Sequence, residues 1–315
     1  DYEQNLRLLL NFVQTPYFTE ETVNKERGII TQEIKRGEDE PEDCQYYNLM
    51  ELIHPGHPVC LHIAGTVESI GEITAETLNT CHKTFYNPSN MVLCIVGNVN
   101  PKDVIKIAEE EVTAPKINVP KPVLGGDNTK ISDIKEKVAE MDVSRTQFLY
   151  GVPFASPDYG VEYRRAKFVS RIAVELFIGE SSELYNELYD SGTVNSDFYV
   201  TTEFVAGVSH LLIGGEGENY EEIISKILEA RENTVETGFD DESFSRIIKH
   251  FYGTILRSFE TFELVALSVV DGVFYGYNHH DILDLILDIK KEECEEFIKT
   301  AFDPDKLRLS LVVPR

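Results

Sequence analysis

Two glutamates within residues 18–41 have the type and the spacing to take part in metal or acid–base chemistry. Glu26 and Glu33 stand seven residues apart, which is two turns of an α-helix, so both carboxylates are expected on one helix face. Glu33 lies beside Ile30 and Ile34 and should therefore sit at the edge of the buried side. A carboxylate held there needs a partner, which could be an arginine, a group of hydrogen-bond donors or a metal ion. A solvated acidic face is the alternative that the pattern leaves open.

The stretch 18–41 predicts one long helix that would position these glutamates. Thr19 is suited to the N-cap position, and Thr22 stands three residues on, where an acid would complete a capping box. Apolar residues recur with a helical rather than a strand period. Pro41 is expected to end the helix, because proline cannot continue the hydrogen-bond ladder.

Composition excludes several classes of partner. The chain has 315 residues and a net charge of −26, so it would repel the phosphates of nucleic acids and of anionic membranes. It contains no apolar run long enough to cross a membrane. Its five cysteines form no C-x-x-C pair, and free thiols are typical of the reducing cytoplasm. We therefore expect a cytoplasmic protein with two domains that binds neither nucleic acid nor membrane.

Two later segments resemble earlier ones and predict an internal duplication. Residues 299–309 resemble residues 83–93, since both contain Lys-Thr, an aromatic residue, an Asn-Pro or Asp-Pro turn and an apolar run. Residues 239–242 resemble residues 18–21, because each has a phenylalanine followed by residues that favour a helix start.

The duplication treats the two glutamates unequally. The same alignment sets Ile247 against Glu26 and Thr254 against Glu33, so only the first copy keeps the acids. A purely structural role for the acids would not predict this asymmetry, although drift alone could produce it.

The duplication also predicts two homologous domains. We expect the later part of the first domain over 1–114, a linker over 115–129 and a second, non-catalytic domain over 130–315. Each full domain is expected to be α+β, a mainly antiparallel sheet with helices packed on one face, with strands at 91–96 and 307–313. Counting back from the second copy sets the start of the first about 90 residues before the chain begins, so the first domain is expected to be incomplete.

A series of short motifs runs through the first 110 residues. The motifs are Lys25-Glu26-Arg27-Gly28-Ile29-Ile30, Glu33-Ile34, His57-Pro58, Gly65-Thr66, Ile73-Thr74, Tyr86-Asn87-Pro88-Ser89-Asn90-Met91 and Gly97. In this order they resemble the pitrilysin/insulinase family of zinc metallopeptidases, and most closely its bacterial, mitochondrial-processing-peptidase-like branch. Over 130–315 the resemblance is one of architecture.

The resemblance implies zinc chemistry. Members of this family carry an inverted motif, H-x-x-E-H, whose histidines bind zinc and whose glutamate activates a water molecule. A distal glutamate is the third protein ligand, and it matches Glu33. Glu26 matches a second acid of the same helix, to which we assign an orienting role. This sequence contains no H-x-x-E-H, so the general base is expected upstream of Asp1 and no catalytic residue is assigned within the chain.

Two hypotheses for the function follow. In the first, the parent protein is a zinc endopeptidase that cleaves peptides or unfolded segments held between two halves of a chamber. In the second, the parent is a non-catalytic chamber partner that binds peptide without cleaving it. Either could involve a homologous second subunit or a homodimer. The chain alone is expected to bind no zinc and to cleave nothing.

Other residues offer alternatives. His54, His57, Cys60 and His62 crowd a nine-residue span and could form a different metal site. However, two of them flank prolines in a loop that matches a family loop without a catalytic role.

The second half also departs from the family pattern. Many members carry an arginine and, seven residues later, a tyrosine that contact substrate. Here these positions fall on Tyr189 and Ser196, which puts the usual mode of substrate binding by the second domain in doubt.

Overall fold

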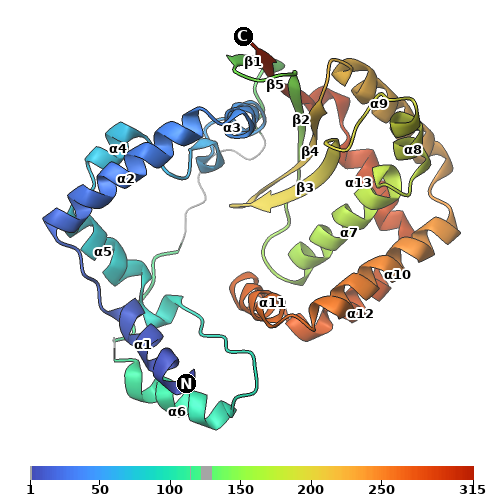
Figure 1. Cartoon of the computed structure of the whole chain (residues 1–315). Helices are drawn as coiled ribbons and strands as arrows, with labels where there is room; N and C mark the ends of the chain where they lie inside the picture. The colour runs from blue at the N-terminus through green and yellow to red at the C-terminus, as the bar shows by residue number, and fades with distance from the viewer. Residues whose placement is uncertain (1, 114, 122–129) are drawn as a thin grey trace. The chain divides into compact units, whose positions relative to one another are not determined.

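The computed structural model of the chain describes residues 2–113, 115–121 and 130–315 (Figure 1). The chain divides into two compact units. We call them the helical unit (Asp1–Lys35, Ile63–Val123 and Phe259–Phe274) and the sheet unit (Arg36–His62, Leu124–Ser258 and Tyr275–Arg315). None of the helices in the described ranges has the length and apolar character that a membrane crossing needs.

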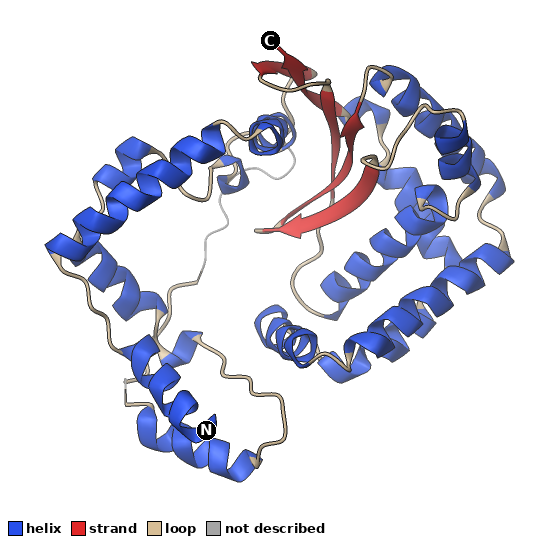
Figure 2. Cartoon of the chain, viewed as in Figure 1, coloured by secondary structure: helices blue, strands red, loops and turns tan. Residues whose placement is uncertain are grey.

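The helical unit contains helices and extended segments but, among its described residues, no strand (Figure 2). Its helices are α1 (Tyr2–Gln14), most of α2 (Glu20–Glu38), α4 (Val67–Gly71), α5 (Ala75–Phe85), α6 (Pro101–Glu111) and most of α11 (Phe262–Tyr275), with the short 3₁₀ turn η2 (Pro88–Asn90). Leu6 and Leu10 of α1 pack on Ile107 of α6 in a small apolar core. Arg7 of α1 also pairs with Glu111 of α6 at 2.6 Å.

The sheet unit is built on five strands. These are β1 (Glu136–Met141), β2 (Gln147–Phe154), β3 (Tyr199–Val205), β4 (Val208–Glu216) and β5 (Arg308–Pro314), in the order β1-β5-β2-β4-β3. Only the β1–β5 pair is parallel; the other three pairs are antiparallel. The predicted α+β class and the mainly antiparallel sheet are therefore confirmed.

Helices cover both faces of this sheet. They are α3 (Pro41–Ile53), α7 (Val161–Ile178), α8 (Glu183–Asp190), α9 (Tyr220–Thr237), α10 (Asp241–Ser258), α12 (Ile282–Asp288) and α13 (Lys291–Ala301), with the 3₁₀ turns η1 (Pro58–Cys60), η3 (His279–Asp281) and η4 (Pro304–Lys306). Side chains alternate along β2, so Leu149 faces α3 whereas Phe148 contacts Tyr220 of α9. The expectation of helices on one face thus holds for the helices after residue 130, and α3 covers the other face (Figure 1).

Helix α3 packs closely on one face of the sheet. Leu49, Met50 and Ile53 pack on Leu149 and Leu212, and all five are buried. At the next inward position of β2 stands Gly151, where an added Cβ would lie 2.8 Å from a methyl carbon of Leu49. The absence of a side chain there lets the helix approach the sheet closely.

The helix predicted over 18–41 is shorter in the structure. Helix α2 runs from Glu20 to Glu38, and Pro41 is the first residue of the next helix, α3. Proline suits the first position of a helix, because its missing N–H would have no partner there.

The strand expected at 91–96 is wrong. Residues 91–96 run without regular secondary structure, although their composition resembles that of β5. A strand needs a neighbour with which to exchange backbone hydrogen bonds, and the described residues of the helical unit provide none. Residues Arg308–Pro314 form a strand because β1 and β2 flank them.

The two resembling segments do share a local geometry. After α5, the Asn87 side chain accepts a hydrogen bond from the Ser89 amide and starts η2. After α13, the Asp303 side chain accepts the same bond from the Asp305 amide and starts η4. Both are Asx turns with proline at the next position. The duplication of whole domains, and the division at 114 and 130, stay predictions.

Candidate functional site

Glu26 and Glu33 both lie on α2, as predicted, and both are exposed. Seven residues of helix separate their Cα atoms by about 10 Å along the axis, so the two carboxylates cannot occupy neighbouring positions on one ion. Ile34 beside them is 3% exposed, which confirms that Glu33 adjoins the buried stripe. The partner expected for Glu33 is not found: no hydrogen bond or ion pair joins it to another part of the described chain.

Two contacts fix the helix that carries these acids. At its start, the Thr22 amide donates to the Thr19 hydroxyl at 3.2 Å and the Thr19 amide donates to the Thr22 hydroxyl at 3.0 Å. A threonine thus completes the box that was expected to need an acid. Farther along, the Arg27 guanidinium donates to the carbonyls of Ile70 in α4 and of Ile73 after it, at 3.2 and 2.7 Å, which fixes α2 to α4 and to the segment that follows.

The described residues offer a zinc ion one ligand rather than a full site. Zinc in peptidases takes three protein ligands and leaves one position open to water. Glu33 has the right chemistry for one of them, because its carboxylate is exposed and has no competing cation among the described residues. No cluster of three or more histidine, cysteine or acidic side chains in the described part of the chain could hold an ion.

The residues considered as an alternative metal site make separate contacts in the structure instead of meeting at one point. His62 contacts Asp43 at 3.5 Å. The Cys60 thiol donates to the carbonyl oxygen of His54 at 3.0 Å. The His54 ring instead turns to the sheet, where its Nε2 lies 3.1 Å from Nδ1 of His210.

His54 belongs to a chain of hydrogen-bonded polar side chains that connects α3 with the sheet and is buried at its two histidines. His210 Nε2 lies 3.0 Å from a carboxylate oxygen of Glu203, and the Tyr46 hydroxyl donates to the same oxygen at 3.0 Å. We call these four residues the His54 relay. Burial, followed by the neighbouring rings of His210 and His57, lowers the pKa of His54 to about 3. The hydrogen bond from His210 lowers the pKa of Glu203. One signal for the relay is visible in the sequence, because His210 interrupts the apolar run of β4.

A second feature beside α3 is an open groove of about 630 Å³. It lies between the start of α3 and the ends of β2, β3 and β4. Its lining residues are Glu42, Asp43, Gln45, Tyr46, Gln147, Leu149, Asp197, Tyr199, Gly215 and Glu216, and we call it the acidic groove because every charged side chain among them is a carboxylate. Tyr189 and Ser196, the positions that depart from the family pattern, are exposed on α8 and just before β3.

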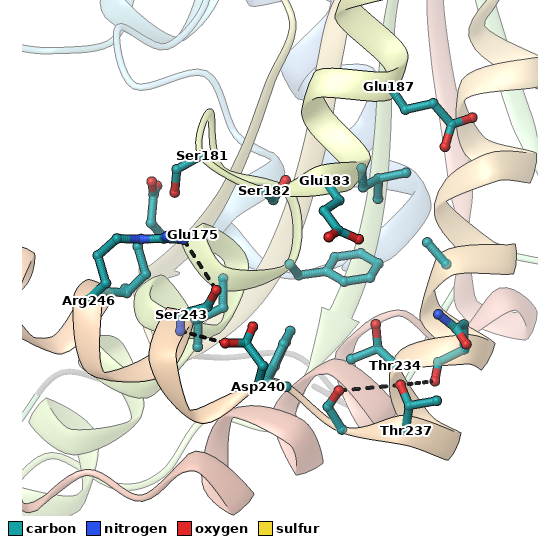
Figure 3. A pocket seen from close by; sticks show the side chains of 18 residues that line it. Glu175, Ser181, Ser182, Glu183, Glu187, Thr234, Thr237, Asp240, Ser243 and Arg246 are labelled. Carbon is teal, nitrogen blue, oxygen red and sulfur yellow. Dashed lines mark hydrogen bonds between the residues drawn. The ribbon is translucent and has the colours of Figure 1, made fainter.

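A third cavity, of about 460 Å³, lies where α7, α8, α9 and α10 meet (Figure 3). Some of its polar groups form hydrogen bonds at the start of α10. The Ser243 amide donates to Asp240 at 2.8 Å, and Arg246 donates to the Ser243 hydroxyl at 3.3 Å. The hydrogen bond from the Ser243 amide is the main cause of the lowered pKa of Asp240, and it caps the start of α10.

Comparisons with known proteins give the family. A family model described as the peptidase M16 inactive domain matches residues 72–251. The uncharacterized zinc protease YmfH of Bacillus subtilis is 33% identical over 321 residues, which cover 99% of this chain and 74% of the relative. A further relative, the uncharacterized zinc protease ML0855 of Mycobacterium leprae, is 24% identical, and the match spans 52% of its length.

Solved structures agree. An M16-like peptidase from Alicyclobacillus acidocaldarius superposes with a TM-score of 0.88 at 26% identity, covering 100% of this chain and 76% of that one. The ferredoxin protease FusC, solved in complex with Arabidopsis ferredoxin, shares the fold with a TM-score of 0.68 at 18% identity and matches over 36% of its own length. The metallopeptidase resemblance drawn from the motifs is thereby confirmed at the level of the family, and the chain belongs to the M16 peptidases.

Proposed function

We propose that the polypeptide carrying this chain is a zinc metalloendopeptidase, to which the chain contributes Glu33 as the third zinc ligand. The observation that carries the proposal is the exposure of Glu33, without a partner among the described residues, on a helix fixed at its N-terminus and at Arg27. Family membership and relatives named zinc proteases support it. The mitochondrial-processing-like branch, an incomplete first domain and a cytoplasmic location belong to the same proposal.

Three residues of α2 then have different roles. A bound zinc ion would supply Lewis acidity and an acidified water molecule. Glu33 would hold the ion with a carboxylate and one negative charge, while two partner histidines and the general base would come from an H-x-x-E-H outside this sequence. Glu26, about 10 Å away along the helix, acts as an orienting residue through other groups. Arg27 holds the helix in register with the segment it contacts.

The test uses the natural polypeptide that contains this sequence. We expect close to one zinc ion per polypeptide by atomic absorption, cleavage of an unstructured fluorogenic peptide, and loss of both with a chelator. Polypeptide that is folded, but has no zinc and no activity, would contradict the proposal.

That contrary result would favour the second candidate, a chamber subunit that binds peptide without cleaving it. The match of residues 72–251 to a domain described as inactive supports this alternative. Binding of an unstructured peptide without cleavage distinguishes it from a protein with no role in proteolysis.

We also propose that the acidic groove binds basic segments of a peptide or unfolded protein. The carboxylates of Glu42, Asp43, Asp197 and Glu216 line it, and they attract cationic side chains at a range set by salt. A partner protein is already known for one structural relative, FusC. A homologous second subunit remains part of the proposal for the chamber.

The predicted preference is measured by calorimetry on this chain with two unstructured peptides that differ only in Lys or Glu at matched positions. We expect the lysine peptide to bind at least about tenfold more tightly at low salt. The paired change Glu42→Gln with Asp197→Asn should remove most of this preference. The control pair Glu229→Gln with Glu236→Gln, exposed on α9, removes the same net charge; an equal loss there would show that only total charge matters.

A further inference from the structure

The His54 relay connects two segments that are far apart in the sequence. Tyr46 and His54 come from α3 and its C-cap, whereas Glu203 and His210 come from β3 and β4. His54 is 3% exposed and His210 is fully buried. Every bond of the relay joins the helix to the sheet or joins two strands, so its protons bear directly on the docking of α3.

The positions of those protons follow from the partners. Glu203 is ionised at neutral pH and accepts from the Tyr46 hydroxyl and from His210 Nε2–H. In the neutral tautomer that donates to Glu203, His210 carries its one proton on Nε2, so its bare Nδ1 accepts from His54 Nε2–H. Nδ1 of His54 is then a bare nitrogen, buried and without a partner in the described structure. The pair of rings thus uses exactly one proton in the bond between them.

We propose that the His54 relay is an acid-sensitive latch, which holds α3 on the sheet near neutral pH and releases it as the pH falls. A first added proton can be tolerated, because a doubly protonated His210 would still bond to Glu203 while His54 changes tautomer. A second cannot, since two N–H groups would then face each other across 3.1 Å with no acceptor between them. Once α3 has left the sheet, His54 and His210 no longer face each other, and each ring can bind a proton.

The groups around the latch reinforce this direction. His57, in the loop after α3, has its ring centre 6.3 Å from that of His54, and its Nε2 is also buried without a partner in the described structure. A cavity of about 410 Å³ beside His54 is lined by Lys130 and Lys306. Two of the residues that line it are therefore cationic, although Lys306 is paired with Asp303 at 3.4 Å.

The other titratable groups near the latch either also favour release of α3 as the pH falls, or titrate only at a lower pH, or do not titrate in this range. Burial lowers the pKa of both His54 and His57 below the ordinary value of a histidine, so docking is favoured above pH 6.5 and weakens as the pH falls. The lowered pKa of Glu203 adds a loss only where carboxylates protonate. Tyr46 and Cys60 stay protonated throughout, since burial raises the pKa of each.

The expected size of the effect follows from proton counting. The released α3 takes up at least one proton more than the docked helix below pH 6.5, so its release equilibrium rises about tenfold per pH unit. Between pH 7.5 and pH 5.0 the hydrogen-exchange protection of α3 amides should fall at least about thirtyfold after correction for intrinsic exchange. Amides of α7 should lose much less, because no histidine lies in that helix.

The decisive variant is His54→Gln. The glutamine amide can donate where Nε2–H donated, yet it does not titrate, so α3 should stay docked and its protection should vary much less with pH. His250→Gln on α10, where the histidine is exposed, is the matched control and should keep the wild-type dependence. Protection of α3 that does not change with pH in the wild type, or an unchanged pH dependence in His54→Gln, would overturn the latch.

A measurement on the wild type covers the case in which the variant does not fold. Nitrogen-15 spectra of histidine-labelled chain at pH 7.5 should show His54 and His210 both neutral and protonated at Nε2. A proton on Nδ1 of His210 at that pH would contradict the assigned relay and with it the latch.

Discussion

Replacing Glu33 with glutamine in the natural polypeptide that contains this chain is expected to reduce both zinc affinity and peptide cleavage by more than about a hundredfold, the upper range for residues that act from outside the ligand shell. Glutamine keeps the shape of the side chain but removes the negative charge that neutralises the ion. The measurement is zinc content after dialysis against a weak chelator, together with kcat/KM for an unstructured peptide. A thermal melt shows whether the variant is folded.

Two further substitutions make the result specific. Glu26→Gln should reduce activity about 10–100-fold, as expected for an orienting residue. Thr254→Ala, at the matching position of the second copy and exposed on α10, should leave zinc and activity unchanged. If the Glu33 variant keeps its full zinc and activity, Glu33 is a surface acid and the zinc proposal loses its ligand.

The largest expected effect on stability comes from Leu49→Ala in α3. Leu49 is fully buried between the helix and the sheet, and a leucine truncated at such a site leaves a cavity. We expect the free energy of unfolding of the sheet unit to fall by about 3–5 kcal/mol, measured by urea unfolding with near-ultraviolet circular dichroism.

The close approach of Gly151 to Leu49 provides a matched test of this packing. Gly151→Ala alone should destabilise the sheet unit, because its Cβ would lie 2.8 Å from Leu49 Cδ2. Combined with Leu49→Ala, the added methyl group fills part of the cavity, so the double variant should be more stable than the sum of the single effects predicts. Gly28→Ala, where nothing lies within 4 Å of the added methyl, is the control and should not destabilise. Additive effects at positions 49 and 151 would refute the contact.

Much of the fold was predictable because its signals are local. The helix expected over 18–41 is observed as α2 over Glu20–Glu38, and Thr19 starts it through a bond to a residue only three positions on. The strand expected over 307–313 is observed as β5 over Arg308–Pro314. Glu26 and Glu33 could be placed on one helix because helical spacing depends on neighbouring residues only.

The rest depends on contacts distant in sequence. The His54 relay needs Glu203 and His210, about 150 residues from α3, and no pattern within either segment specifies that meeting. Segment 91–96 has the composition of a strand, but strand formation depends on a neighbour. The second covered face of the sheet was also missed, because nothing in residues 41–53 says which surface their apolar side will bury.

The position of β5 between β1 and β2 has a consequence for biosynthesis. Strand β5 (Arg308–Pro314) is the last of these five strands in chain order, yet it occupies an interior place in the sheet, and its residues pair with residues 157 to 173 positions earlier in the chain. Until it arrives, β1 has no partner in the described sheet, and β2 exposes an unpaired edge. The five-stranded sheet therefore cannot be completed before β5 has been made. A nascent chain arrested within residues 136–307 exposes the unpaired edges of β1 and β2, where chaperones or other unfolded chains can bind.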